Sequence, residues 1–208
     1  MSISYAVTVW NELAELKNLL PQLYENKQLE DQVVVLFDSN NGTKEVQEYL
    51  EQYSKTVGSD FIWASGRFEK DFAEWKNQLN SHCTGDYIFQ VDADEYLPTT
   101  LIEILPDLLK ANPEVDLYYV PRINTVEGLT EEHVRRWGWK YENSRVNWPD
   151  YQTRIYRNSE SIKWRNKVHE VIDGHKHYTV LPPLDELALI HSKTIERQEK
   201  QNAYYATL

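Results

Sequence analysis

Strand-like and helix-like segments alternate four times between Ser4 and Val91, and this order constrains the fold more than any other feature of the chain. Residues 32–37 (QVVVLF) form an almost continuous apolar run, which is typical of a strand buried on both faces of a parallel sheet. Strands that alternate with helices build βαβ units around such a sheet. We therefore predict an α/β protein with a mostly parallel, doubly wound sheet and helices on both faces.

The expected elements follow from apolar periodicity and from turn residues. Pro21 predicts a kink or an early end of the first helix, and Gly85 ends the third. The long segment 124–150 is polar and tryptophan-rich, and we expect it to be a functional connection. With no repeat and no linker, we expect one domain, residues 1–208. The expected strands are 4–9, 32–37, 60–64, 87–91, 117–121, 153–156, 167–172 and 187–191, and the expected helices are 12–23, 43–53, 71–83, 101–109 and 194–205.

Composition excludes several classes of protein. The formal net charge is −11, which argues against a general nucleic-acid binder because phosphate contacts need a basic face. No segment approaches 18 consecutive apolar residues, so we expect no transmembrane segment. A single cysteine, Cys83, allows neither an internal disulfide nor a thiolate zinc cluster. We therefore expect a cytoplasmic protein, or one that is peripheral to a membrane.

Three of the expected strands end in polar clusters. These are Trp10-Asn11-Glu12, Asp38-Ser39-Asn40 and Asp92-Ala93-Asp94. The carboxyl ends of parallel strands meet at one edge of the sheet, where ligands bind in α/β folds. The clusters therefore predict a ligand site at that edge.

The stretch FQVDADE, residues 89–95, is the strongest chemical signal. In an extended segment Asp92 and Asp94 point to the same side. Two carboxylates so placed make a hard oxygen site for Mg²⁺ or Mn²⁺, and magnesium-type ions keep open positions for substrate phosphates. Taken alone, the same residues also fit a charged loop after a strand. Glu95 need not touch a metal.

Residues around this stretch resemble those of family 2 glycosyltransferases with the GT-A fold. The order is Trp10-Asn11-Glu12, Asp38, Lys76-Asn77, Thr84-Gly85-Asp86 and Asp92 to Glu95. In that family an aromatic-Asn-Glu strand end, an acid that meets the nucleotide base and a basic residue with Asn precede the D-x-D motif. Two features depart from the family pattern: Thr8-Val9-Trp10 stands where a Pro and a Tyr or Phe are common, and Asp38-Ser39 lacks a following acid.

The second half is similar to a bacterial branch related to lipopolysaccharide-core transferases. It contains an R-I-Y-R strand at residues 154–157, the sequence V-H-E at 168–170 and a late histidine, His191, before a charged helix. The resemblance implies that residues 1–97 hold the nucleotide sugar and the metal. Residues 98–208 would form the acceptor side and the C-terminal helix.

The resemblance implies a metal-dependent glycosyltransferase that inverts the anomeric carbon. The donor would be a nucleotide-diphosphate sugar, with a UDP-sugar expected first, and the acceptor a hydroxyl of a glycan, a lipid-linked sugar or another molecule. Asp92 and Asp94 would hold Mn²⁺ or Mg²⁺, which stabilises the leaving diphosphate. The general base would be Asp150 or Glu170, and the sequence does not separate these two carboxylates.

Further residues have both a functional and a structural interpretation. His191 is either a third metal ligand or a histidine bonded to the backbone, and His169 either contacts ligand or positions Glu170. Lys76 either neutralises a phosphate or pairs with an acid, and Arg154 either contacts the diphosphate or balances the carboxylates. The expected substrate-binding residues are Trp10, Glu12, Asp38, Lys76, Asp92, Arg154 and His169.

Two other functions compete with sugar transfer. A nucleotidyltransferase of the same fold would carry a Gly-rich, basic loop after the first strand, where Trp10-Asn11-Glu12 has none. A catalytically inactive nucleotide-sugar-binding module would have lost its acids, whereas Asp92, Asp94 and both candidate bases are present.

Overall fold

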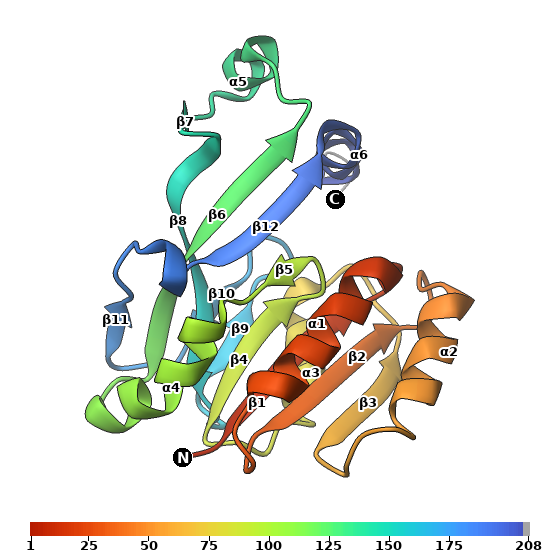
Figure 1. Cartoon of the computed structure of the whole chain (residues 1–208), viewed down its shortest axis with the longest axis vertical. Helices are drawn as coiled ribbons and strands as arrows, with labels where there is room; N and C mark the ends of the chain where they lie inside the picture. Colours follow the sequence, from red (N-terminus) through yellow and green to blue (C-terminus); the bar gives the residue numbers. More distant parts are fainter. Residues whose placement is uncertain (206–208) are drawn as a thin grey trace.

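A computed structural model describes residues 1–205, with side chains through Ala203. One large mixed sheet forms the centre of the molecule, in the order β3-β2-β1-β4-β8-β6-β12-β5 (Figure 1). Strand β11 pairs with β6, β7 pairs with β8, and β9 and β10 form a separate two-stranded sheet. The predicted α/β class, with helices around a central sheet, is confirmed.

The N-terminal half is a parallel sheet built from the predicted alternation of strands and helices. β2 and β4 flank β1 in parallel, and β3 extends the sheet beyond β2. All seven residues of β2 are buried, as its apolar run predicts. The elements are β1 (Ile3–Val9), α1 (Leu13–Asn26), β2 (Gln32–Asp38), α2 (Lys44–Tyr53), β3 (Phe61–Gly66), α3 (Phe72–Asn80) and β4 (Tyr87–Asp92).

Helices cover both faces of this sheet. Apolar residues of α1, α2 and α4 pack with one set of strand side chains into a single core cluster. Residues of α3 pack on the opposite face together with Trp164 of β9 and Ile172 of β10. The small β9–β10 sheet therefore completes the layer that α3 begins, behind the main sheet in Figure 1.

The second half adds antiparallel pairing and a projecting lobe. β8 runs antiparallel to both β4 and β6, and β12 lies parallel to β6. The distal ends of β6 and β8 extend beyond the sheet and carry α5 (Figure 1). The elements are β5 (Glu95–Tyr96), α4 (Thr99–Ala111), β6 (Leu117–Glu127), α5 (Glu131–Trp137), β7 (Tyr141–Glu142), β8 (Arg145–Arg157), β9 (Lys163–Arg165), β10 (Val171–Asp173), β11 (Tyr178–Val180), β12 (Leu189–Thr194) and α6 (Ile195–Tyr205).

Three predicted elements differ from the structure. Helix α1 continues through Pro21 to Asn26, because buried leucines before and after the proline hold it on the sheet. Segment 124–150 is no irregular connection but contains the end of β6, α5, β7 and the start of β8, and β8 pairs with both β6 and β7. Residues 167–170 form a loop in which His169 has a positive φ of 56°, so the predicted strand 167–172 is reduced to β10.

No helix within residues 1–205 is both long and apolar enough to cross a membrane.

Candidate active site

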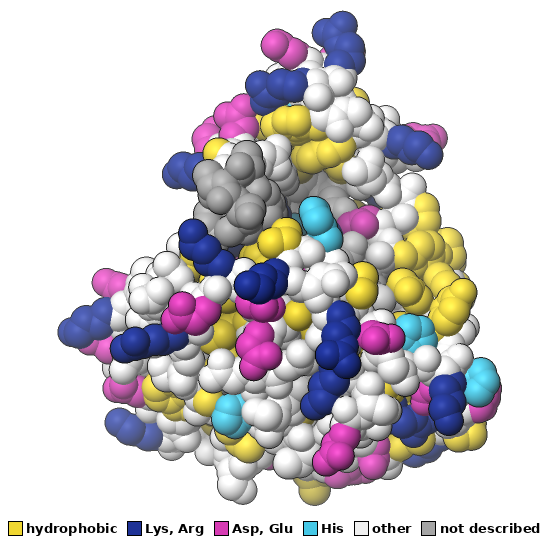
Figure 2. Space-filling view, turned by 180° about the vertical axis from the view of Figure 1, so that it is seen from behind, with side chains coloured by type: hydrophobic (Ala, Val, Ile, Leu, Met, Phe, Trp, Pro, Cys, Tyr) yellow, Lys and Arg dark blue, Asp and Glu magenta, His cyan; other side chains and the backbone are white. Residues whose placement is uncertain are grey.

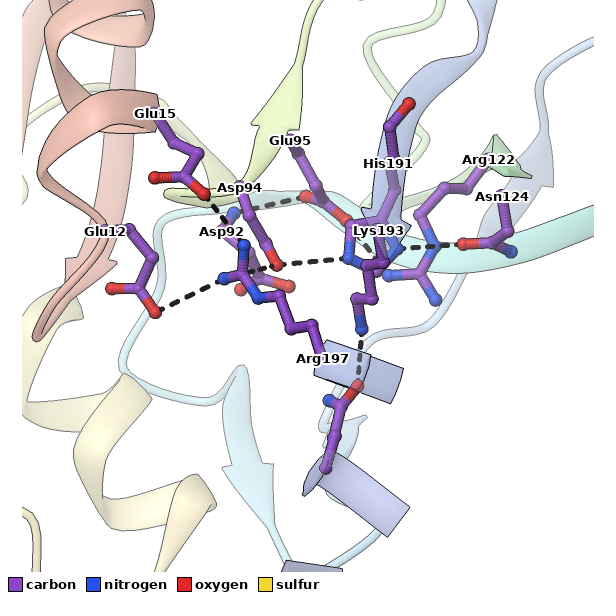
Figure 3. A network of polar contacts seen from close by, with 12 residues as sticks. Glu12, Glu15, Asp92, Asp94, Glu95, Arg122, Asn124, His191, Lys193 and Arg197 are labelled. Atoms are coloured by element: carbon purple, nitrogen blue, oxygen red, sulfur yellow. Dashed lines mark hydrogen bonds and ion pairs between the residues drawn. The ribbon is translucent and has the colours of Figure 1, made fainter. Parts of the chain in front are cut away.

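The acidic stretch after β4 is a turn that faces several strands of the second half. β4 and β5 are consecutive in the chain, yet β8, β6 and β12 stand between them in the sheet. The chain turns at Ala93 and Asp94, so the stretch is not extended as the sequence predicts. Asp92 and Asp94 consequently have different partners, as Figure 3 shows.

Asp92 belongs to a network of buried ion pairs. Its carboxylate accepts from Arg154 Nη2 at 2.5 Å, and the same nitrogen lies 2.5 Å from Glu95 Oε1. Glu95 is fully buried and also accepts from Arg122 Nη1 at 3.0 Å. Burial alone would raise the pKa of Asp92, but the nearby charges of Arg154 and Lys76 lower it overall. Asp92 is therefore ionised. Glu95 accepts hydrogen bonds from both Arg122 and Arg154 and so holds these two side chains in place.

Asp94 faces His191, which β12 brings to the site by pairing with β5 and β6. His191 Nε2 lies 3.2 Å from Asp94 Oδ2, and His191 Nδ1 lies 2.9 Å from Asn124 Oδ1. Asn124 Nδ2 donates to Asp150 Oδ2 at 2.8 Å, and this bond fixes the orientation of the amide. Since Asn124 Oδ1 can only accept, His191 Nδ1 carries the proton. In a neutral imidazole, Nε2 then presents a lone pair to the Asp94 carboxylate.

Two acceptors that face each other require a proton or a cation between them. A carboxylate oxygen and an imidazole nitrogen are a suitable ligand pair for Mn²⁺, and a partner on the other ring nitrogen is the usual support for a metal-binding histidine. Asp94 and His191 therefore fit a divalent cation. Within residues 1–203, no three His, Cys, Asp or Glu side chains converge as a metal cluster, and the predicted role of Asp92 as a ligand stays a prediction.

Arg197 of α6 also approaches the acidic turn. Its Nη2 lies 3.2 Å from Asp94 Oδ2 and 3.7 Å from Glu12 Oε1, while Nη1 donates to Glu15 at 2.8 Å. Burial would raise the pKa of Asp94; when a proton lies between Asp94 and His191, the imidazole lowers this pKa together with nearby Lys193, and the overall direction is downward. Asp94 is thus an ionised carboxylate that contacts an imidazole and a guanidinium.

Asp150 lines a cavity of about 300 Å³ beside this turn. Figure 2 shows the surface hollowed between the projecting lobe and the body of the molecule. Oδ2 of Asp150 accepts from Arg122 at 2.8 and 3.0 Å and from Asn124, whereas Oδ1 accepts from Gln152 at 2.8 Å. Other residues lining the cavity are Thr125, Val126, Trp139, Val146, Asn147, His191, Lys193, Gln198 and Gln201.

Glu170 lies in a different environment. Its carboxylate accepts from Lys76 Nζ at 2.6 Å, and the same ammonium stands 4.2 Å above the ring of Trp164. Lys76 is buried on α3 and is close enough to Asp92 to lower its pKa. The structure therefore brings Lys76, Glu170 and Asp92 together, and Glu170 does not line the cavity beside Asp150.

The other predicted binding residues lie at the ends of β1 and β2 or in a loop. The backbone and indole N–H groups of Trp10 donate to Glu12, whose pKa burial raises. Asp38 accepts from the backbone N–H groups of Asn40 and Phe68 and from the Asn41 side chain, so it shapes its own loop. His169 is exposed in the 167–170 loop.

Arg122 and Asn124 are site residues that the sequence interpretation does not include. They stand two apart on β6, so they share one face of the strand and both reach Asp150. The alternation of Pro121, Arg122, Ile123 and Asn124 is the one sequence signal that could have identified them, because polar and apolar residues alternate there.

The predicted GT-A fold is confirmed by the similarity of this chain to known proteins. A family model described as glycosyl transferase family 2 matches residues 4–179. A search of curated proteins finds no match.

Solved structures with the same fold include Staphylococcus aureus TarS 1-349, with a TM-score of 0.64 at 15% identity, covering 92% of this chain and 60% of that one. The same protein in complex with UDP-GlcNAc matches with a TM-score of 0.64 at 17% identity, covering 93% and 59%. The mannosyltransferase PcManGT from Pyrobaculum calidifontis, in complex with GDP-Man and Mn²⁺, matches at 0.56 and 13% identity, covering 91% and 56%. The chain thus spans less than two thirds of each of these proteins.

Proposed function

Because the chain belongs to glycosyl transferase family 2, we propose that it transfers a sugar from a nucleotide-diphosphate sugar to an acceptor hydroxyl, with inversion of the anomeric carbon and with Mn²⁺ or Mg²⁺ bound. The observation that carries this proposal is the pair Asp94 and His191, whose facing acceptor atoms suit a divalent cation beside the Asp150 cavity. We assign donor and metal binding to residues 1–97, with His191 and Arg154 added from the second half.

The donor is a nucleotide-diphosphate sugar, with a UDP-sugar as the first candidate and a GDP-sugar as the second. TarS complexed with UDP-GlcNAc and PcManGT complexed with GDP-Man have the same fold, and these complexes support the choice. Asp94 and His191 would hold the cation, which supplies positive charge to the leaving diphosphate. Lys76 and Arg154 add further positive charge beside Asp92.

Asp150 is our general base for the acceptor hydroxyl. Burial would raise its pKa, but Arg122, Asn124 and Gln152 lower it overall, so the carboxylate is ionised and able to accept a proton. Gln152 is the one donor to Oδ1 in the described part of the chain, so one lone pair of that oxygen can face a hydroxyl in the cavity. Glu170, paired with Lys76, is the alternative base.

The acceptor is a hydroxyl of a glycan, a lipid-linked sugar or another molecule that enters the cavity. Trp139 lines this cavity together with polar side chains, and an aromatic ring of this kind can pack on the apolar face of a sugar. The cavity volume of about 300 Å³ is in the range of small-ligand sites, which run from about 300 to 1,000 Å³.

A panel of nucleotide sugars tests the proposed function. We expect slow, Mn²⁺-dependent release of a nucleoside diphosphate from one UDP- or GDP-sugar, because water can replace the acceptor. Mass spectrometry would identify the products. Release of pyrophosphate from a nucleoside triphosphate and a sugar phosphate would instead indicate a nucleotidyltransferase, and binding without any turnover would indicate an inactive module.

A further inference from the structure

Arg197 connects α6 to three carboxylates that belong to two other parts of the chain. The guanidinium reaches Glu15 at 2.8 Å, Asp94 at 3.2 Å and Glu12 at 3.7 Å. Figure 3 shows Arg197 extending from α6 to lie between the acidic turn and two glutamates, Glu12 just before α1 and Glu15 within it. One guanidinium therefore forms ion pairs with three carboxylates.

The contact with Asp94 uses the oxygen that faces His191. Asp94 Oδ2 lies 3.2 Å from His191 Nε2 and 3.2 Å from Arg197 Nη2. A Mn²⁺ or Mg²⁺ ion bound at this carboxylate would lie about 2.1 Å from a ligating oxygen. An arginine nitrogen at the same oxygen would then be within a few ångströms of a divalent charge, and the two cations would repel each other strongly.

Few other ion pairs or hydrogen bonds hold α6 in place. Within the described side chains, Glu199 of α6 pairs with Arg136 at 2.8 Å and with His133 at 3.7 Å, both from α5. Gln201 accepts from Lys193 at 2.5 Å. The described side chains of α6, from Ile195 to Ala203, are mostly polar. Arg197 is thus the side chain that attaches α6 to the acidic turn and to α1.

We propose that Arg197 is a built-in competitor of the divalent cation at Asp94, so that cation binding displaces Arg197 and loosens α6. This inference rests on the proposed function, because it takes Asp94 and His191 as the cation site. The exchange replaces one positive charge by two at a cluster of three carboxylates, which favours the cation. The displaced guanidinium loses Asp94 and is repelled from the turn, so α6 loses its attachment to the acidic turn, and Arg197 keeps only its links to the glutamates.

Cation binding by itself tests the competition. Free Mn²⁺ is measured by electron paramagnetic resonance during titration of the wild-type protein and of Arg197→Gln. We expect Arg197→Gln to bind Mn²⁺ about fivefold more tightly, the order of effect that one ion pair of this exposure can have. Arg197 is 36% exposed, so the substitution leaves the fold intact, which circular dichroism verifies.

Arg136→Gln is the matched control. It removes another arginine ion pair of α6, to Glu199, at the same distance of 2.8 Å that Arg197 has to Glu15. Because Arg136 does not touch Asp94, its replacement loosens the helix without removing the competitor. We expect the Mn²⁺ affinity of Arg136→Gln to equal that of the wild type. An equal gain in Mn²⁺ affinity in Arg197→Gln and Arg136→Gln would overturn the proposal.

Hydrogen exchange of α6 gives a readout that does not involve catalysis. We expect Mn²⁺ to speed the exchange of the α6 amides in the wild type and to leave their exchange unchanged in Arg197→Gln. Mn²⁺ binding of equal strength in both proteins, with no change in α6, would overturn the competition and leave the proposed function standing. If neither protein binds Mn²⁺, even with a nucleoside diphosphate present, the cation site and the competition are both wrong.

Discussion

At the scale of single residues, Asp150 and Glu170 are distinguished by their hydrogen-bond partners. Asp150 lines the cavity and has one oxygen with a single amide donor, whereas Glu170 is paired with the buried ammonium of Lys76. A base must reach the hydroxyl from which it removes the proton. The two carboxylates therefore predict different kinetic effects when each is replaced by its amide.

We expect Asp150→Asn to lower kcat by about 10²- to 10⁴-fold, the usual contribution of a general base, while the affinity for the donor stays within about twofold. Glu170→Gln leaves Lys76 unpaired near Asp92, so its main effect should be on the KM for the donor. Steady-state kinetics with the donor found in the nucleotide-sugar panel would measure both constants. If Glu170→Gln loses kcat and Asp150→Asn does not, the assignment of the base is reversed.

The sequence indicates which residues are candidates for the site but not how they are connected. Asp92, at the end of β4, and Asp94, just after it, lie near His191 of β12, and Asp150, inside β8, lines the cavity beside them. The orientation of His191 depends on Asn124, which is 67 residues away in the chain. Such a contact depends on the register between β6 and β12, which local periodicity does not contain.

At the scale of elements, the turn between α3 and β4 depends on close contact with β1. A Cβ atom on Gly85 would lie 2.7 Å from the backbone nitrogen of Ser4 and 2.8 Å from the carbonyl carbon of Ile3. The Gly85 N–H also donates to Ser4 Oγ at 2.9 Å. Since backbone atoms of a central strand cannot move aside easily, this position requires glycine.

We expect Gly85→Ala to lower the free energy of unfolding by about 1–3 kcal/mol, the usual cost of overpacking. Urea denaturation followed by circular dichroism would measure it. Gly58→Ala is the control, because the Cβ there would meet only the end of the Asp60 side chain, which can rotate away. If both variants lose the same free energy of unfolding, the destabilisation comes from the loss of glycine itself and not from contact with β1.

Elements were predictable where their side chains are buried and unpredictable where they are not. The strands β1, β2 and β4 are almost fully buried, so their apolar runs identify them. Strand β8 has mainly half-exposed residues in its first eight positions, and backbone pairing with β6 and β7 keeps it extended without an apolar pattern. Helix α1 passes through Pro21 because burial of its leucines outweighs one missing hydrogen bond.

At the scale of the whole molecule, the single cysteine reports on the integrity of the fold. Cys83 is 8% exposed in the core beside α3, and burial raises the pKa of its thiol to about 12. Only the thiolate reacts with disulfide reagents. We expect labelling at pH 8 to be slower than in the denatured chain by on the order of a thousandfold, and to accelerate in urea in parallel with unfolding. Rapid labelling of the native protein would show that the α3 layer opens on its own.

The chain order of the first half predicted the overall architecture. Four alternations of strand and helix imply a parallel sheet whose carboxyl edge collects the strand ends, and the structure has this arrangement. The second half could not be derived in this way, because β8 inserts antiparallel between β4 and β6 and brings Asp150 and Arg154 to the same edge.

Titration calorimetry with a nucleoside diphosphate tests the central claim most directly. UDP, with GDP as a second probe, is titrated into the wild-type protein and into Asp94→Ala, each with Mn²⁺ and with a chelator. We predict binding to the wild type only when Mn²⁺ is present, and none to Asp94→Ala, whose circular dichroism stays that of the folded protein. Binding of equal strength in the presence of the chelator, or undiminished Mn²⁺-dependent binding to Asp94→Ala, would contradict the assignment of this site.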